Sequence, residues 1–286
     1  MIEAALRPRG PYSLRQSARL AGDATRTIQG GRLTAVLDVD GRLELAAAWQ
    51  RRDGIVVCRA QSEDGIDAIR FALGLDDDHT PFLTRFADDP LIGRAVRKLR
   101  GVRPVRLGTV TQALLRAVCG QLITAREARG IERRIIREAM PEFAGTGLHA
   151  PPTPAAMARF SPAELRRFGL GIRRATALVR LSRALDLEGL RGVPTAAAAD
   201  RLERERGLGP WSVGVICLQG LGRYERGLVG DLGLIKLVSA LRGRWAEAWE
   251  TAELLEPYGE WQGLASVYLL SGFHEGLIPL APRAAA

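Results

Sequence analysis

The chain has 286 residues, of which 47% are hydrophobic, and a formal net charge of +9. This length and apolar content suffice for two or three packed domains, and a basic balance is typical of proteins that approach a polyanion. No apolar run reaches membrane-spanning length and the N-terminus lacks a signal-peptide core, which excludes membrane and secreted classes. We therefore expect a cytoplasmic, nucleoid-associated protein with no membrane partner.

Cysteine and histidine offer little chemistry in this sequence. Cys58, Cys119 and Cys217 are too far apart for a C-x-x-C metal knuckle or an iron–sulfur loop. Their apolar neighbours favour buried free thiols in a reducing compartment. The run from Asp76 to His79 has the composition of a metal cluster, but no partner ligands stand at a useful spacing. We interpret it as a solvated linker or a helix cap.

The N-terminal part has a strand pattern. Residues 12–61 alternate between apolar and polar positions, and Asp40-Gly41 and Asp53-Gly54 interrupt the pattern as hairpin turns. An antiparallel meander is predicted, followed by a helix at about 66–73. We assign residues 1–76 to a β-rich cap domain without catalytic residues.

Everything beyond about Thr80 has a helical pattern. Residues 108–140 predict two helices with a break at 120–124, and further helices begin at Thr153-Pro154 and at the capping box of Ser161 and Glu164. Later helices are predicted at 172–185, 196–206, 231–242 and 261–270. The predicted fold class is α+β, with a small sheet domain before a mainly α-helical region.

The segment from Gly207 to Asp231 is the most informative one. Gly207 and Gly209 can turn the backbone with no Cβ in the way, so amide groups can approach a phosphate closely. The helix that begins near Pro210 points its positive end at that phosphate. Asp231 follows one helix and one loop later. Taken separately, these features are also those of an ordinary helical turn and a helix N-cap.

In order and spacing, the glycine hairpin and Asp231 resemble the AlkA-like DNA-3-methyladenine glycosylases of the helix-hairpin-helix–Gly/Pro–Asp superfamily. The segment RAVCGQLITAREA resembles that family's helix break, and PPTPAAMARFSPAELRRFGLGIRRATALVRLSRAL resembles the helices that follow. The similarity extends over about residues 12–275. It implies a two-lobed helical core, with 77–109 and 226–286 in one lobe, 110–225 in the other, and the helix-hairpin-helix motif at about 196–220.

The resemblance also implies roles for single residues. Asp231 would be the catalytic carboxylate that stabilises positive charge on the sugar and orients or deprotonates water. Leu122 would be the wedge that fills the gap left by a flipped nucleotide, although a core position for this leucine is the alternative. Trp211 would line the base pocket. The expected DNA contacts are Gln121, Leu122, Arg206, Gly207, Leu208, Gly209 and Trp211.

Departures from the family pattern bear on mechanism and substrate. Lyase-type relatives carry a Schiff-base lysine where this chain has Trp211, and lysine occurs here only at Lys98 and Lys236. The resemblance thus implies a monofunctional enzyme that leaves an abasic site. Family aromatics of the base pocket correspond to Val215 and Leu270. Tyr224 or Tyr268 would have to compensate for them.

No catalytic cofactor and no iron–sulfur cluster are expected. The family's hairpin holds a monovalent cation, Na⁺ or K⁺, through backbone carbonyls that correspond to Glu203, Glu205 and Leu208. The expected partner is damaged double-stranded DNA, with no obligate protein partner, and the expected substrate is an alkylated purine of the 3-methyladenine or 7-methylguanine type. A glycosylase for an oxidised or deaminated base, or a helix-hairpin-helix protein that binds DNA without catalysis, are the alternatives.

Overall fold

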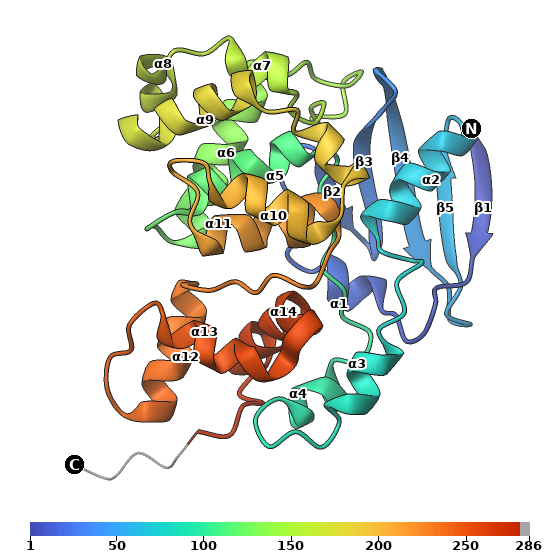
Figure 1. The fold of residues 1–286 in the computed structure, drawn as a ribbon. Helices are drawn as coiled ribbons and strands as arrows, with labels where there is room; N and C mark the ends of the chain where they lie inside the picture. The colour runs from blue at the N-terminus through green and yellow to red at the C-terminus, as the bar shows by residue number, and fades with distance from the viewer. Residues whose placement is uncertain (281–286) are drawn as a thin grey trace.

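The computed structural model describes residues 1–280 (Figure 1). Its N-terminal part is one antiparallel sheet in the order β1-β5-β4-β3-β2. The strands are β1 Ile2–Leu6, β2 Arg26–Gln29, β3 Arg32–Val39, β4 Arg42–Gln50 and β5 Val56–Ala60. The predicted meander is confirmed in β3, β4 and β5. Asp40 and Gly41 have φ angles of 49° and 81°, the pair of positive values that a tight hairpin of this kind needs.

Strand β1 and helix α1 Leu14–Ala18 were not predicted, and α1 lies inside residues 12–61, where strands were expected, so the strand prediction is wrong there. Strand β1 lies on the sheet edge, where Ala4 pairs with Cys58, and helix α1 precedes β2. The β1 sequence is short and rich in alanine, so its strand character comes from pairing with β5 and not from alternation. Helix α2 Glu63–Ala72 packs against β3, β4 and β5, and its buried residues complete the core of the domain (Figure 1).

The remainder is helical, so the predicted α+β class is confirmed. The α-helices are α3 Thr80–Arg85, α4 Gly93–Lys98, α5 Val110–Gly120, α6 Ala125–Ala139, α7 Pro154–Ala158, α8 Pro162–Arg167, α9 Ile172–Ala184, α10 Thr195–Glu203, α11 Pro210–Val215, α12 Leu232–Arg242, α13 Glu250–Leu255 and α14 Gln262–His274. Two 3₁₀ segments lie at Glu188–Gly192 and Glu256–Trp261, and a π-helical segment, Ile216–Leu221, extends α11.

The helices form two groups (Figure 1). Helices α5 to α11 lie together beside the sheet, and α12 to α14 lie with α3 and α4 below them. One hydrophobic cluster runs through both groups. Helix α5 is central to it, because nine of its eleven residues are buried. Within residues 1–280, no helix is both long enough and apolar enough to cross a lipid bilayer.

The run from Asp76 to His79 differs in part from the solvated linker that we expected. His79 is only 1% exposed, and burial, with a smaller effect of Arg103, lowers its pKa to about 4. Asp77 accepts hydrogen bonds from Arg106 and Tyr224. The Asp78 carboxylate accepts the Thr80 N–H at 2.9 Å just before α3, but the N-cap position is His79, which makes no side-chain cap. Asp77 and His79 are therefore packed against residues distant in the sequence, whereas Asp76 and Asp78 are exposed, as a solvated segment would have them.

A buried ionic network joins the loop before β2 to α5 and α6. The Asp23 side chain is 1% exposed and lies 3.2 Å from Arg26 and 2.7 Å from Arg116, and Arg116 also lies 2.8 Å from Glu132. Burial alone would raise the pKa of Asp23, but Arg26, Arg116 and two hydrogen bonds from Thr25 outweigh burial and lower it. The carboxylate therefore stays ionised. Its ion pair with Arg116 links the β-rich N-terminal domain to the helical region.

Replacing Asp23 by alanine should destabilise the protein by about 3–5 kcal/mol, because it leaves two arginines buried with less compensating charge. Urea unfolding measures the change. The contribution of Asp23 should be present above about pH 4, the range of the unfolded carboxyl, and disappear as the pH falls through the lowered native pKa. Glu3→Ala, which breaks the exposed Glu3–Arg59 pair, is the control, with an expected cost of about 1 kcal/mol or less. Equal losses in the two variants would contradict this account.

Candidate active site and DNA-binding surface

Asp231 is the N-cap of α12. Its Oδ1 accepts the backbone N–H groups of Gly233 at 2.7 Å and Leu234 at 3.3 Å, and its backbone is extended. The preceding Gly230 has a φ of 85° and donates its N–H to the Thr251 hydroxyl at 2.7 Å. The Asp231 side chain is half-buried, so its carboxylate is neither in the hydrophobic core nor fully exposed to solvent. The capping role is thus compatible with a catalytic one.

The second carboxylate oxygen of Asp231 contacts Trp211. The indole Nε1–H donates to Oδ2 at 2.9 Å. Trp211 lies in the first turn of α11, and its six-membered ring packs so closely on Gly120, the last residue of α5, that a methyl group there would overlap with the ring. The end of α5 and the starts of α11 and α12 therefore meet around one tryptophan.

The turn between α5 and α6 presents Leu122 to solvent. Its side chain is fully exposed, at 102% of the reference value, and its φ is 61°. The core alternative for this leucine is therefore wrong. A leucine with a backbone in the left-handed region is strained, and a fully exposed leucine gains no stability from burial. Strained residues of this kind cluster at functional sites. The structure places an apolar side chain at the tip of the turn, as the wedge hypothesis requires.

Gln121 has a different setting from its neighbour. Its side-chain amide donates to the Gly207 carbonyl at 2.8 Å and to the Ser212 hydroxyl at 3.0 Å. Arg174 of α9 donates to the carbonyls of Cys119 and Gln121, at 3.2 and 2.8 Å. The Leu122 turn is thereby tied to the glycine hairpin on one side and to α9 on the other. Arg174 was not identified from the sequence, because nothing in its local pattern indicates a contact 53 residues away.

The glycine hairpin has the geometry that was expected. Gly207 has a φ of 94°, and any Cβ there would lie 2.9 Å from Ala177. Nothing lies within 4 Å of the Cβ position at Gly209, which is the N-cap of α11 without a side-chain cap. The backbone at this end of the helix is therefore exposed at Gly209 and Pro210. Arg206 is exposed, whereas Leu208 is buried and anchors the turn.

Comparisons with known proteins show which proteins this chain is similar to. No family model matches the chain. A DNA-3-methyladenine glycosylase from Bacillus subtilis (strain 168) is 28% identical over 205 residues, which cover 68% of this chain and 67% of that protein. A 3-methyladenine DNA glycosylase from Archaeoglobus fulgidus has the same fold, with a TM-score of 0.79, 20% identity, and coverage of 96% of this chain and 98% of that one.

The chain has the same fold as that solved glycosylase, a small antiparallel sheet followed by a helical region. The resemblance inferred from the sequence is confirmed. An 8-oxoguanine glycosylase/lyase from Clostridium acetobutylicum, solved with double-stranded DNA, shares the same glycosylase fold with a TM-score of 0.77, 18% identity, and coverage of 97% of this chain and 99% of that one. These similarities show that the chain shares the fold of solved DNA glycosylases, one of which was solved with DNA. Because the neighbours are named for different bases, the fold alone does not identify the lesion.

The aromatic residues of this glycosylase fold are placed differently from the expectation. Tyr268 is fully buried in the core and donates to the Leu99 carbonyl at 3.1 Å, and Tyr224 stacks on Trp261 and bonds to Asp77. Neither hydroxyl is directed at Asp231, so the idea that these tyrosines replace the missing aromatics is not supported. Leu270 does lie beside the site, because a Cβ on Gly233 would be 2.5 Å from its methyl carbon and 3.0 Å from Asp231 Oδ1.

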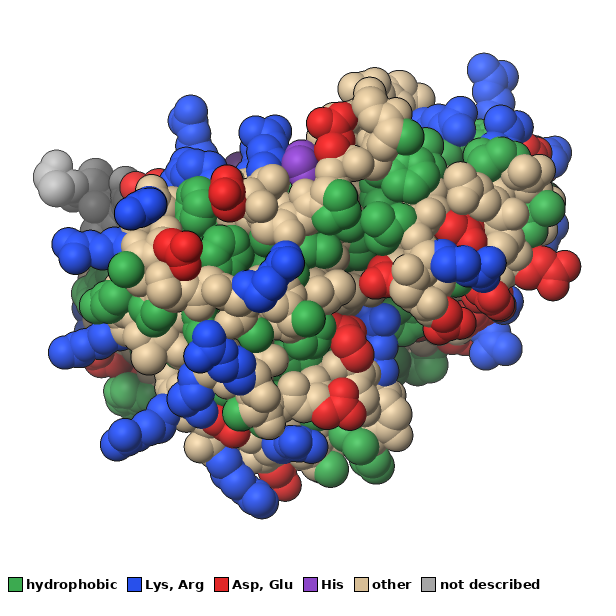
Figure 2. Space-filling model, turned by 90° about the horizontal axis from the view of Figure 1, so that it is seen from above, with side chains coloured by type: hydrophobic (Ala, Val, Ile, Leu, Met, Phe, Trp, Pro, Cys, Tyr) green, Lys and Arg blue, Asp and Glu red, His purple; other side chains and the backbone are tan. Residues whose placement is uncertain are grey.

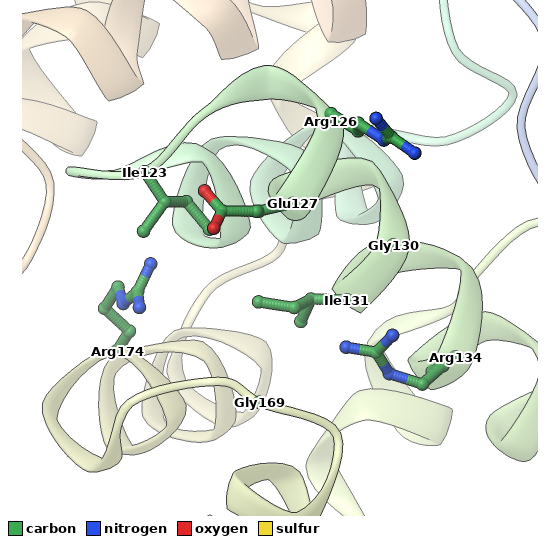
Figure 3. Close-up of a pocket in the computed structure, with 8 residues that line it drawn as sticks. All are labelled: Ile123, Arg126, Glu127, Gly130, Ile131, Arg134, Gly169 and Arg174. Carbon is green, nitrogen blue, oxygen red and sulfur yellow. The ribbon is translucent and has the colours of Figure 1, made fainter.

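A basic cavity of about 480 Å³ lies next to the Leu122 turn, between α6 and the start of α9 (Figure 3). Ile123 and Ile131 form its apolar part. Arg134 and Arg174 extend into it from opposite sides, whereas Arg126 points outward from the rim. Its one acidic residue, Glu127, is engaged in a capping box with Thr124. The sequence did not indicate this cavity. Arginine and lysine side chains project from much of the face seen in Figure 2, with acidic side chains between them.

The capping role of Asp231 can be tested apart from catalysis. Asp231→Ala should lower the free energy of unfolding by about 1 kcal/mol, because two backbone donors of α12 lose their acceptor. Asp231→Asn should cost clearly less, since the amide oxygen can still cap the helix. Urea titrations of the two variants beside the wild type give both values. An alanine variant as stable as the wild type would contradict the cap geometry described here.

Proposed function

We propose that the protein is a monofunctional DNA glycosylase of base excision repair. It flips an alkylated purine of the 3-methyladenine or 7-methylguanine type and hydrolyses its N-glycosidic bond, leaving an abasic site. The observation that carries this proposal is the half-buried Asp231 carboxylate, fixed by α12 and Trp211, at the same junction from which Leu122 projects.

The chemistry requires little more than this carboxylate. As the bond between the sugar and the base breaks, positive charge develops on the deoxyribose, and a fixed anion nearby stabilises it. The same oxygen atoms can orient or deprotonate the attacking water. An alkylated purine already carries a positive charge and therefore leaves without a strong general acid. A single carboxylate, Asp231, is thus sufficient for this class of substrate, whereas a neutral oxidised base needs a stronger general acid in order to leave.

DNA binding is assigned to the surface around the two turns. Leu122 enters the duplex and replaces the stacking of the flipped base with apolar contact, and it has no polar atom to leave unpaired. The backbone amides around Gly209 receive a phosphate, with Arg206 exposed beside them. Gln121 acts here by holding the two turns together, because its amide group is engaged inside the protein. The basic cavity adds sequence-independent attraction for the backbone.

Two observations favour an alkylated base over the oxidised alternative. The relative with the higher identity, from Bacillus subtilis, is named for 3-methyladenine. An electron-rich tryptophan, Trp211, lies against the carboxylate, where its face can stack on a cationic base. The shared fold with an 8-oxoguanine glycosylase/lyase keeps the oxidised base as the second candidate.

A monovalent cation at the hairpin is part of this proposal. The carbonyls of Glu203, Glu205 and Leu208 are hard oxygen donors, which suit Na⁺ or K⁺. The Glu205 carbonyl accepts the Leu208 N–H at 3.1 Å and keeps one lone pair. These donors fit a weakly held cation whose contribution is to fix the turn and its phosphate contact. Among residues 1–280, no group of three or more His, Cys, Asp or Glu side chains is placed to hold a metal ion.

Incubation of the protein with methylated duplex DNA should release 3-methyladenine and 7-methylguanine, which chromatography identifies. Asp231→Asn should slow the release by about 100-fold or more, because an amide cannot stabilise the developing charge. Its affinity for a duplex with an abasic site should stay close to that of the wild type. A wild type that binds DNA but frees no base would support the non-catalytic alternative, and release from 8-oxoguanine duplexes alone would support the oxidised substrate.

Sodium borohydride should trap no covalent protein–DNA adduct, since the lyase position holds Trp211 and Lys236 lies exposed on α12. Gel electrophoresis of the reaction mixture with a lyase-type glycosylase as positive control makes the measurement. An adduct that disappears in Lys236→Ala would overturn the monofunctional assignment and identify the nucleophile.

A further inference from the structure

We infer that Trp211 is a positioning residue that couples the Leu122 turn to the Asp231 carboxylate. The inference rests on the proposed function and adds to it a second role for the tryptophan. Stacking on a base needs only the face of an aromatic ring. The structure uses two other parts of this side chain, the indole N–H and the edge of the six-membered ring, to connect the turn that enters DNA with the residue that acts on the sugar.

The first connection fixes the carboxylate. Two backbone N–H groups of α12 hold Oδ1, and the Trp211 indole holds Oδ2 at 2.9 Å. The terminal torsion of an aspartate is soft, so the Oδ1 bonds alone leave the direction of the other oxygen loosely defined. The indole donor supplies the remaining constraint. A hydrogen bond to a charged acceptor is among the stronger ones in proteins, and this one acts on the oxygen that α12 does not hold.

The second connection reaches the Leu122 turn. The ring edge of Trp211 packs on Gly120, two residues before Leu122. Gln121, between them, bonds to the Gly207 carbonyl and to the hydroxyl of Ser212, the residue after Trp211. A displacement of the turn when Leu122 enters a duplex is therefore passed on to the start of α11 and to the indole. The chain of contacts is short, and each member is held in place by packing or hydrogen bonds.

The stacking role and the positioning role make different demands on the side chain. Phenylalanine at position 211 keeps an aromatic face for a base, but it has no donor for Asp231 and lacks the six-membered indole ring that contacts Gly120. A stacking partner tolerates this change, whereas a positioning residue does not. Gly120→Ala makes the complementary change. It keeps the indole donor of Trp211, but the added methyl group displaces the Trp211 ring from its contact with the end of α5.

The indole N–H gives a direct readout that does not depend on activity. The chain has five tryptophans, so a ¹⁵N-indole spectrum of the labelled protein should show five side-chain signals, and Trp211→Phe identifies the one from Trp211. Asp231→Ala should move that signal and speed its exchange with water. A duplex with an abasic site should shift it in the wild type and shift it less in Leu122→Ala. Trp245, whose side chain is 63% exposed, should respond to neither substitution and is the internal control.

Single-turnover base release completes the test. Trp211→Phe should release base about 10-fold more slowly, as expected when a charged hydrogen bond that aligns a reacting group is lost, while its affinity for the abasic duplex changes less than about threefold. Gly120→Ala should show the same division between rate and affinity. Trp245→Phe is the matched control and should behave as the wild type.

Unchanged release by Trp211→Phe, an equal loss of rate and affinity, or a Trp211 signal that ignores Asp231→Ala would each overturn the positioning role. Failure of the proposed function has a different signature, because a wild type that releases no base leaves the indole measurements intact. In that case the signal from Trp211 still decides whether the tryptophan connects the turn to the carboxylate.

Discussion

The candidate site depends on the hydrogen bonding of both oxygens of the Asp231 carboxylate. One oxygen closes the N-terminus of α12 and the other receives the Trp211 indole. A carboxylate at a helix start gains from the aligned peptide dipoles, which suits a group that has to remain an anion beside a developing cation. Gly230 and Thr251 fix the backbone that leads into it. The acid is thus part of the scaffold as well as of the proposed chemistry.

Helix α5 connects this site to the rest of the molecule. Its C-terminal residue receives the Trp211 ring, and the turn after it carries Leu122. Midway along the same helix, Arg116 forms the buried network with Asp23 and Glu132 that attaches the β-rich domain. Because the helix is buried along most of its length, it cannot shift without disturbing the core. Leu122, the proposed wedge, therefore projects from a turn that follows a buried helix and that protein contacts hold from two sides.

Features with a local chemical signature were predictable from the sequence. The Asp-Gly turns, the capping box at Ser161, the break after Gly120 and the cap at Asp231 all depend on neighbours in the chain. Strand β1 and the burial of His79 were missed, because they depend on β5 and on residues from other helices. Arg174 and the basic cavity were missed for the same reason. The sequence indicated Trp211 as an aromatic face, but its hydrogen bond to Asp231 required the folded chain.

The close contact between Gly120 and Trp211 ties the sizes of these two positions together. Space for a side chain at the end of α5 exists only if the ring opposite becomes smaller, and a large ring requires glycine there. Related chains should consequently fall into two groups. One has glycine at the position of Gly120 and a large aromatic residue at the position of Trp211. The other has a larger residue at the first position and a narrow side chain, such as that of lysine, at the second. A shift from simple hydrolysis to strand cleavage would then involve a pair of exchanges, one on each helix, rather than one.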